Sequence, residues 1–262
     1  MPNPFPLAKL PNPGYNNHTD MRIKTTKGGL PMTLRKDTLE TKRRILSVCV
    51  RLFLQQGYHA TSISQIAAEA GISVSTFQNI FHTKDAVLHE LIGFMFSGQF
   101  SAARDMAGPA LPPLYVYAAE TAIQLALTEL NENLRDIYLV AYSLPETAEY
   151  IHRQTAAELL AIFGPNFPGS GPQDFYELEI GTAGLMRGYM AQRCGLYFPL
   201  ERKIQRFLTS SMRVYRVPEE EQSQALAYIA GLNVTATAGD VMAKLFSLLE
   251  MTFDFKLTET EE

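Results

Sequence analysis

The sequence predicts an all-α fold, and three observations support this prediction. From Leu34 onward, apolar residues recur at helical spacing almost without interruption. No stretch alternates apolar and polar residues over enough positions to indicate a β-sheet. The chain has 262 residues, of which 46% are hydrophobic and 19% are charged, so it can bury a sizeable core in one large or two modest domains.

The first 33 residues differ in composition from the rest of the chain. They hold six of the fifteen prolines and no apolar periodicity, which predicts a disordered N-terminal arm over residues 1–33. No basic stretch is followed there by an apolar run, and no apolar segment of the chain approaches the roughly 18 residues of a membrane span. We therefore expect a soluble, cytoplasmic protein without a membrane partner.

The first two helices are marked by an apolar stripe and a capping signal. The first is expected over about residues 36–56, because apolar residues recur at i, i+3, i+4, i+7 and i+8 from Ile45, and Gly57 ends it. The sequence from Ser62 to Gln65 has the form of a capping box that opens the second helix. This second helix is expected to stop at Gly71.

The third helix is expected to read DNA. Ser73 caps it, and Val74, Phe77 and Phe81 are expected to face inward. The link Gly71-Ile72-Ser73 makes the turn of a helix-turn-helix, since glycine allows the left-handed conformation of a tight corner. The outward side chains are short or carry amides that can hydrogen-bond to phosphates and base edges. Similar helix pairs also occur in bundles that never contact DNA.

The candidate DNA contacts extend around this reader helix. Helix N-termini favour anions, so the starts of the second and fourth helices are expected to hold phosphates. A basic arm with Arg22, Lys24 and Lys27 can lie along the minor groove, or it can be a solvated tail. The full candidate set is Arg35, Lys36, Thr61, Ser62, Ser73, Ser75, Thr76, Gln78, Asn79, His82 and Lys84.

The charge distribution supports a nucleic-acid partner at one end of the chain. The net charge is −4, but residues 22–90 hold ten basic and five acidic residues. Residues 91–262 hold twelve basic and twenty-one acidic residues. A basic front end on an acidic body suits phosphate contact at the front end only.

Further helices are expected after the prolines at 109, 112 and 113. Their expected ranges are about 114–130, 133–144, 146–163, 174–194, 200–215, 219–231 and 237–252, with a loop at 164–172. The fourth helix begins at Thr83 and is expected to link a helix-turn-helix domain over residues 34–83 to a larger helical domain over residues 84–262.

Residues 41–88 resemble the DNA-binding region of the tetracycline-repressor (TetR) family. The resemblance is carried by the run KRRILSVCVRLFLQQGYHATSISQIAAEAGIS, followed by Thr76-Phe77, Phe81 and Lys84. The family usually has Tyr where this chain has Gln78, and Tyr or His where it has Ile80. The resemblance implies a homodimer that binds a palindromic operator in double-stranded DNA, with a small-molecule effector that relieves repression. It also implies a dimer interface from two late helices, here those over 174–194 and 200–215.

The helical body offers candidates for an effector site and a dimer contact. Aromatic and polar side chains between residues 94 and 190 are expected to line a pocket for an apolar or aromatic molecule, or to be ordinary core. Gly181, Ala183, Gly184 and Gly188 permit close helix approach, within a dimer or within one subunit. The candidate ligand-binding residues are Phe94, Phe100, Tyr117, Tyr138, Tyr142, Met186, Arg187 and Tyr189.

Signatures of enzymes, metal sites and cofactors are not found. His59, His82, His89 and His152 form no HExxH, and no phosphate-binding GxxxxGK[ST] occurs. Cys49 and Cys194 lack metal or redox spacing, so both are expected to be small buried residues. We expect no enzymatic activity, metal or cofactor. The alternatives are a helical transcriptional activator, or a regulator controlled by a protein partner through its C-terminal helices.

Overall fold

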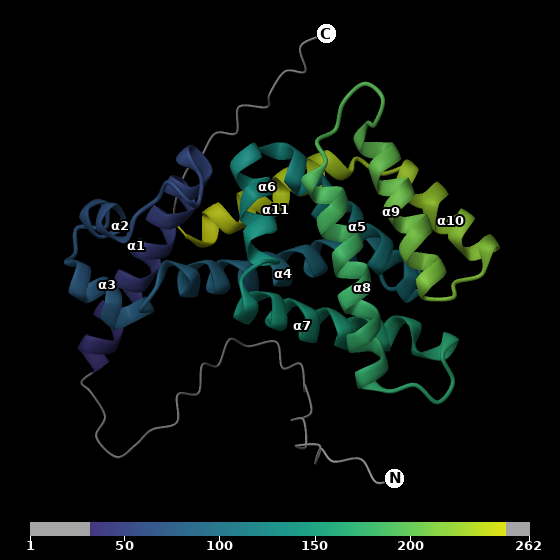
Figure 1. Ribbon diagram of the computed structural model, residues 1–262, viewed down its shortest axis with the longest axis horizontal. Coiled ribbons are helices and arrows are strands. Elements are labelled where there is room, and N and C mark those ends of the chain that lie inside the picture. The colour runs from purple at the N-terminus through teal and green to yellow at the C-terminus, as the bar shows by residue number, and fades with distance from the viewer. Residues whose placement is uncertain (1–31, 250–262) are drawn as a thin grey trace. The chain divides into compact units, whose positions relative to one another are not determined.

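The computed structural model describes residues 32–249 and the side chains of residues 37–249. The chain divides into two units, residues 1–37 and residues 38–262, and only the first turns of one helix are described in the first unit. The described residues form eleven α-helices and one 3-10 turn, with no β-strand, so the all-α prediction is confirmed for them (Figure 1). None of the described helices is both long enough and apolar enough to cross a membrane.

The helices follow the expected order, with boundaries that differ by a few residues. The first begins at Met32, four residues before the expected start, so the last two residues of the expected arm are helical. The rest of that arm, residues 1–31, lies outside the described residues. The elements are α1 (Met32–Gln56), α2 (Ile63–Glu69), α3 (Val74–Phe81), α4 (Lys84–Ala107), α5 (Pro113–Leu130), α6 (Glu132–Ala141), α7 (Pro145–Phe163), η1 (Gly164–Asn166), α8 (Pro172–Ala191), α9 (Leu200–Val214), α10 (Glu219–Ala230) and α11 (Val234–Leu248).

Local capping signals set the starts of the helices near the N-terminus. The hydroxyls of Ser62, Ser73 and Thr83 each accept a hydrogen bond from the backbone amide three residues later, as expected of N-caps. Gly71 has φ +65°, which confirms the left-handed corner between α2 and α3. The Gln65 side chain, expected to complete a capping box, instead pairs with the amide of Gln56.

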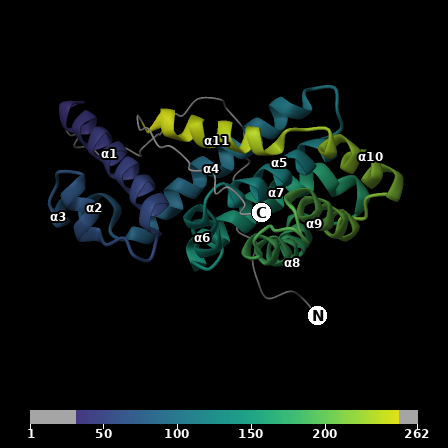
Figure 2. The same ribbon diagram turned by 90° about the horizontal axis from the view of Figure 1, so that it is seen from above.

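Helix α5 is the centre of the body. It packs against α4, α6, α7, α8, α9, α10 and α11, and thirteen of its eighteen residues are buried. A helix that is apolar on all sides is stable only when neighbours surround it. The other body helices are therefore arranged around α5 (Figures 1 and 2).

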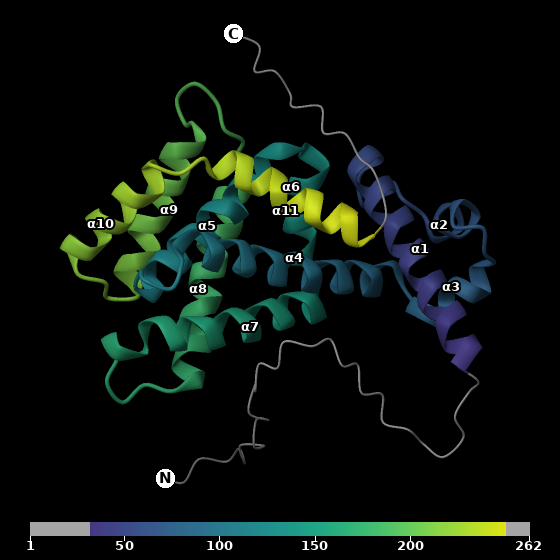
Figure 3. The same cartoon turned by 180° about the vertical axis from the view of Figure 1, so that it is seen from behind.

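The C-terminal helices complete the core of the body. Helix α11 runs along α4 and α5 (Figure 3), and its residues Met242, Leu245 and Phe246 are buried. Met242 and Leu245 meet Phe53 of α1 and Ile137 of α6 around a small apolar cavity of about 30 Å³. Helix α11 thus supports the junction between α1 and the body, a role that its sequence did not predict.

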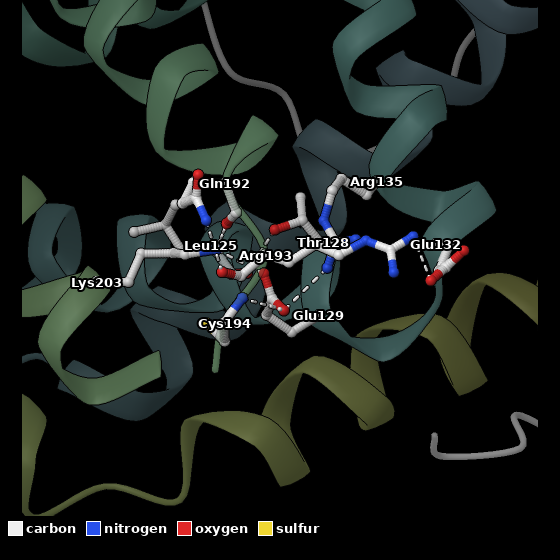
Figure 4. Close-up of polar contacts among 9 residues, drawn as sticks. All are labelled: Leu125, Thr128, Glu129, Glu132, Arg135, Gln192, Arg193, Cys194 and Lys203. Carbon is white, nitrogen blue, oxygen red and sulfur yellow. Dashed lines mark hydrogen bonds and ion pairs between the residues drawn. The ribbon is translucent and has the colours of Figure 1, made fainter. Parts of the chain in front are cut away.

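A buried polar cluster joins the C-terminal end of α5 to α6 and α9 (Figure 4). The Lys203 side chain is fully buried, and its ammonium donates to Glu129 Oε1 at 2.6 Å and to the backbone carbonyl of Gln192. The second carboxylate oxygen of Glu129 accepts from Arg135 Nη2 at 2.9 Å and from the backbone amide of Cys194 at 3.2 Å. Charge pairing and hydrogen bonds together compensate for the burial of these ions.

Replacement of Lys203 by Met tests the structural role of this cluster. Lys203→Met leaves Glu129 with one fewer cation and the carbonyl of Gln192 with one fewer donor, so we expect unfolding to become easier by roughly 3–5 kcal/mol. Chemical denaturation followed by circular dichroism measures this change. Arg202→Met, an exposed position on the same helix, is the matched control and should shift stability little. Equal effects of the two substitutions would contradict the assignment.

Candidate nucleic-acid interface and ligand cavity

The three N-terminal helices share a compact apolar core. Ile45 and Phe53 of α1, Ile66 of α2, and Phe77 of α3 are completely buried, as the apolar stripes predicted. Phe81 at the end of α3 is also buried. Val74 does not follow the expectation, since it is 39% exposed at the first position of this short helix. The inward face of α3 therefore rests on Phe77 and Phe81.

The outward face of α3 presents polar side chains to solvent. Ser75, Gln78 and Asn79 are exposed, and His82, which is also exposed, follows the helix with φ +57°. The amides of Gln78 and Asn79 form no hydrogen bond with any residue in the described part of the chain. Both amides are therefore free to form paired hydrogen bonds with an external partner.

Three hydroxyl groups gather at the N-terminus of α3. Ser73 Oγ lies 2.8 Å from Ser75 Oγ and 2.9 Å from Thr76 Oγ1, and it accepts from the Thr76 amide at 3.0 Å. These hydroxyls surround backbone amides that face outward at a helix start. Ser62 is exposed and caps the start of α2 in the same way. Both helix starts have the local chemistry that phosphate contact requires.

Lys84 and Thr61 are turned inward in the structure. The Lys84 ammonium donates to the backbone carbonyls of Tyr58 at 2.6 Å and Thr61 at 2.8 Å, and it lies 4.1 Å from the centre of the Tyr58 ring. Burial lowers the pKa of Lys84 from its ordinary value. Thr61 is buried, and its hydroxyl donates to the carbonyl of Gly57 at 2.8 Å. Both side chains hold the loop between α1 and α2 in place, a role that differs from the expected phosphate contact.

Several basic side chains of this region form ion pairs within the protein. Lys42 lies 2.7 Å from Glu90, and Arg51 pairs with Glu69. The excess of basic residues in the sequence therefore overstates the charge available to a phosphate backbone. The side chains of Arg35 and Lys36, and the basic arm before them, lie outside the described residues.

The candidate ligand-binding residues fall into different environments. Tyr117, Tyr142 and Met186 line one internal cavity. Phe94 lies on the surface and is 42% exposed, and Arg187 is exposed and donates to Ser143 Oγ at 3.1 Å, so neither lines the cavity. The remaining three are occupied by other contacts: Phe100 packs against Phe96, Tyr138 accepts a hydrogen bond from Gln99, and Tyr189 packs against Phe198 and Phe207.

The cavity has a volume of about 30 Å³ and lies among α4 to α9. The polar residues of its lining were not predicted from the sequence, because the acidic residues of the body were considered only for their contribution to the net charge. The lining residues are Phe96, Tyr117, Glu120, Thr121, Gln124, Tyr142, Thr155, Leu159, Glu179, Thr182, Ala183, Met186, Phe207 and Tyr215. A larger groove of about 570 Å³ lies between α9, α10 and α11, and it contains none of the candidate residues.

The cysteines also differ from each other. Cys49 is completely buried, as expected, and burial raises the pKa of its thiol. Cys194 is only partly buried, so the expectation of full burial is wrong for this residue. It lies in the segment between α8 and α9, where its backbone amide contacts Glu129.

The geometry of α1 to α3 is that of a helix-turn-helix, and known proteins share similarity with this region. Residues 45–91 match the family model described as "Bacterial regulatory proteins, tetR family". Two curated relatives from Bacillus subtilis (strain 168) are described as uncharacterized HTH-type transcriptional regulators. YerO is 31% identical over 165 residues, 58% of this chain and 55% of its own length. YuxN is 29% identical over 116 residues, 42% of this chain and 38% of its own length.

Solved structures give a weaker likeness. A gamma-butyrolactone receptor (ArpA-like protein) has a TM-score of 0.44 at 16% identity, over 79% of this chain and 99% of the receptor. AmtR of Mycobacterium smegmatis has a TM-score of 0.41 at 19% identity, over 72% of this chain and 93% of AmtR. Similarity at this level supports no inference about the helical body of this chain.

The helix-turn-helix region of the chain is similar to that of TetR-family regulators, which confirms the resemblance inferred from the sequence. The matching family model and both curated relatives are described as regulatory proteins. The matched segments span about half or less of the length of the two curated relatives.

Replacement of Lys84 by Met distinguishes a positioning role from a phosphate contact. Lys84→Met removes two hydrogen bonds to the loop, so we expect a loss of roughly 1–2 kcal/mol in stability. The slope of log K against log salt for DNA binding should stay unchanged, because no phosphate contact is lost. Fluorescence anisotropy at several salt concentrations measures the slope. A decrease of about one unit would instead show that Lys84 neutralises a phosphate. Lys244→Met, at an exposed position of α11, is the control.

Proposed function

We propose that this chain is a ligand-responsive transcriptional regulator that binds a palindromic operator as a homodimer and is released from DNA by a small molecule. The observation that carries this proposal is the exposed face of α3, a helix held by a buried core. There the amides of Gln78 and Asn79 form no hydrogen bond with any described residue. An amide side chain can hydrogen-bond to two edge atoms of adenine in the major groove. The exposed hydroxyls of Ser62, Ser73 and Ser75, with Thr76 beside them, would set the position of α3 on the phosphates.

The exposed face of α8 supports dimerisation. Helices α8 and α9 lie side by side at the edge of the body (Figure 2). On α8, Ile180 and Leu185 are 48% and 37% exposed, beside the exposed glycines Gly181, Gly184 and Gly188. A Cβ atom added at any of these three glycines would meet nothing within 4 Å. An apolar face with small residues would let the same face of a second copy approach closely.

The arrangement of α4 and α6 supports a response of the DNA-binding region to a ligand. Phe96 of α4 and Tyr142 at the end of α6 both line the internal cavity. The same helices reach the DNA-binding region: Lys84 at the start of α4 holds the α1–α2 loop, and Asn133 Nδ2 of α6 donates to the carbonyl of Leu54 at 2.9 Å. Expansion of the cavity would therefore act on two connections to α1 to α3, and so on the spacing of the two reader helices.

The alternative of control by a protein partner through the C-terminal helices is less well supported. The apolar side chains of α11 are buried against α4 and α5 rather than presented outward. An activator and a repressor would share the same fold and reader helix. The position of the operator relative to the promoter separates these two roles.

Footprinting with full-length protein tests the proposed function. The DNA beside the coding sequence of the protein is the first target, and a palindromic protected region is expected, with a dimer in solution by light scattering. Release of the footprint by a small molecule would identify an effector class. The absence of protection on this and on selected random DNA, together with a monomer in solution, would contradict the proposal.

Simultaneous replacement of Gln78 and Asn79 by Ala tests the reader face. We expect operator affinity to fall by about 1–3 kcal/mol per lost base contact, while binding to non-specific DNA stays within about twofold. Anisotropy titrations with operator and scrambled DNA at one salt concentration measure both values. Gln224→Ala, an exposed amide on α10, is the matched control. An equal loss on both DNAs would show that these side chains do not read bases.

Replacement of Gly184 by Glu tests the dimer face. The substitution has room within one subunit, so the subunit should stay folded, but buried charge would oppose a second copy. We expect a shift from dimer to monomer in sedimentation equilibrium and a loss of operator binding. Gly239→Glu on α11, where an added Cβ also meets nothing within 4 Å, should remain dimeric. A dimeric Gly184→Glu variant would place the interface elsewhere.

A further inference from the structure

The internal cavity contains a carboxyl group that has no hydrogen-bond or ion-pair partner between residues 37 and 249. Glu120 of α5 is 7% exposed and lines the cavity. Its side chain forms no hydrogen bond or ion pair with any residue in the described part of the chain. Buried carboxyl groups in proteins normally have hydrogen-bond or charge partners, because their desolvation is costly. A group of this kind beside an empty space is suited to bind something that enters that space.

A second buried carboxyl group faces the same cavity from α8. Glu179 is 3% exposed, and its Oε2 accepts from Thr182 Oγ1 at 3.0 Å. Thr182 Oγ1 in turn lies 2.6 Å from the hydroxyl of Tyr215. His152 Nδ1 approaches Glu179 Oε1 to 3.7 Å, which is longer than a hydrogen bond. Glu179 is thus positioned by neighbours, whereas Glu120 is not.

The rest of the lining is aromatic and carries no positive charge. The rings come from Phe96, Tyr117, Tyr142, Phe207 and Tyr215, and the lining includes no Lys, Arg or His side chain. Aromatic faces attract cations, and this attraction is strongest where water is excluded. An anion would instead meet two carboxyl groups with no compensating charge in the lining.

We propose that this cavity binds an organic cation, with the Glu120 carboxylate as its counter-ion and the surrounding aromatic rings as its walls. This proposal rests on the proposed function, because the organic cation would be the small molecule that releases the protein from DNA. It replaces the wider expectation that the effector is any apolar or aromatic molecule. A cavity of about 30 Å³ has room for little more than water, so a larger cation must displace lining side chains. Displacement of Phe96 and Tyr142 would act on α4 and α6.

Binding of a cation should release a proton from Glu120. Burial, followed by the nearby carboxylates of Glu179 and Glu158, raises the pKa of Glu120 to about 8, so the group is mostly protonated at pH 7 in the empty protein. A bound cation favours the carboxylate, and the proton passes to the buffer. The other titratable groups around this site are Tyr117, Tyr138, Tyr142 and Tyr215, with His152 beside Glu179 and Arg104 beside Glu158.

Calorimetry on the full-length protein with phenyltrimethylammonium tests this proposal. This probe keeps its charge at every pH, and tert-butylbenzene is a neutral molecule of nearly the same shape. We expect the cation to bind at least roughly tenfold more tightly than the neutral molecule. Affinity for the cation should rise by about tenfold per pH unit up to pH 8 and then level off, because only ionised Glu120 binds it. Titrations in two buffers of different ionisation enthalpy should show proton release near pH 7.

Substitutions test whether Glu120 is the group that binds the cation. Glu120→Gln should weaken binding of the cation by at least roughly tenfold and remove the pH dependence, while binding of tert-butylbenzene stays within about twofold. Glu177→Gln, an exposed glutamate on α8, should behave as the unmodified protein. Circular dichroism checks that Glu120→Gln is folded, and the pH series on the unmodified protein needs no variant.

Several outcomes would overturn the inference. These are binding of neither probe, equal binding of both, an affinity independent of pH between 6 and 9, or unchanged cation binding by folded Glu120→Gln. Failure of the proposed function is separate, because it is read from DNA. If the cation bound but did not release the protein from its operator, the cation site would stand and the proposed response of DNA binding to the cation would be wrong. If an unrelated molecule released the protein from its operator and the cation did not bind, the proposed function would stand and the cation site would be wrong.

Discussion

The burial of α5 on all sides is the constraint on which the rest of the body depends. A helix with water on no face can carry a charged side chain only where a neighbour compensates for the lost solvation. Glu129, near its C-terminal end, meets Lys203 and Arg135, and this pairing joins α5 to α6 and α9 (Figure 4). Glu120, nine residues earlier, lines a cavity and has no such partner in the part of the chain that the structure describes. One helix therefore carries a carboxylate that stabilises the fold and a carboxyl group that no described residue pairs with.

The connections between the body and the DNA-binding region follow from the same packing. Helices α4 and α6 both contact α5, and both reach the N-terminal helices, through Lys84 and through the hydrogen bond from Asn133 to Leu54. Helix α11 adds an apolar contact, since Met242 and Leu245 share a small cavity with Phe53. Three elements thus contact α1 or the loop that follows it, and under the proposed function a change around α5 that moved any of them would change the position of α3. Well-packed contacts of this kind pass on displacements because they have little free volume to absorb them.

The fold could be predicted from the sequence largely because its signals are local. The caps at Ser62, Ser73 and Thr83 and the left-handed Gly71 act within four residues, so reading along the chain finds them. The candidate sites depend on which helix faces which, and the sequence does not show this. The position of Lys84 in the sequence predicts a phosphate contact, whereas in the structure its ammonium donates to the carbonyls of Tyr58 and Thr61. Phe94 and Tyr117 are both aromatic residues within helices, yet the first is 42% exposed and the second lines the cavity.

The acidic residues of the body also show that the sequence alone does not reveal which side chains face one another. Counted along the sequence, the acidic residues beyond residue 90 suggest only that this part of the chain avoids DNA. In the structure, two of them are withdrawn from solvent and face one cavity, where burial raises the pKa values of both Glu120 and Glu179. A cation that enters the cavity would reduce the free-energy cost of burying these groups. Because the cavity is small, its entry would also require the helices to move apart. Relief of this electrostatic cost would thus supply part of the free energy needed to reposition α4 and α6, which links the recognition of the ligand to the movement of the DNA-binding region.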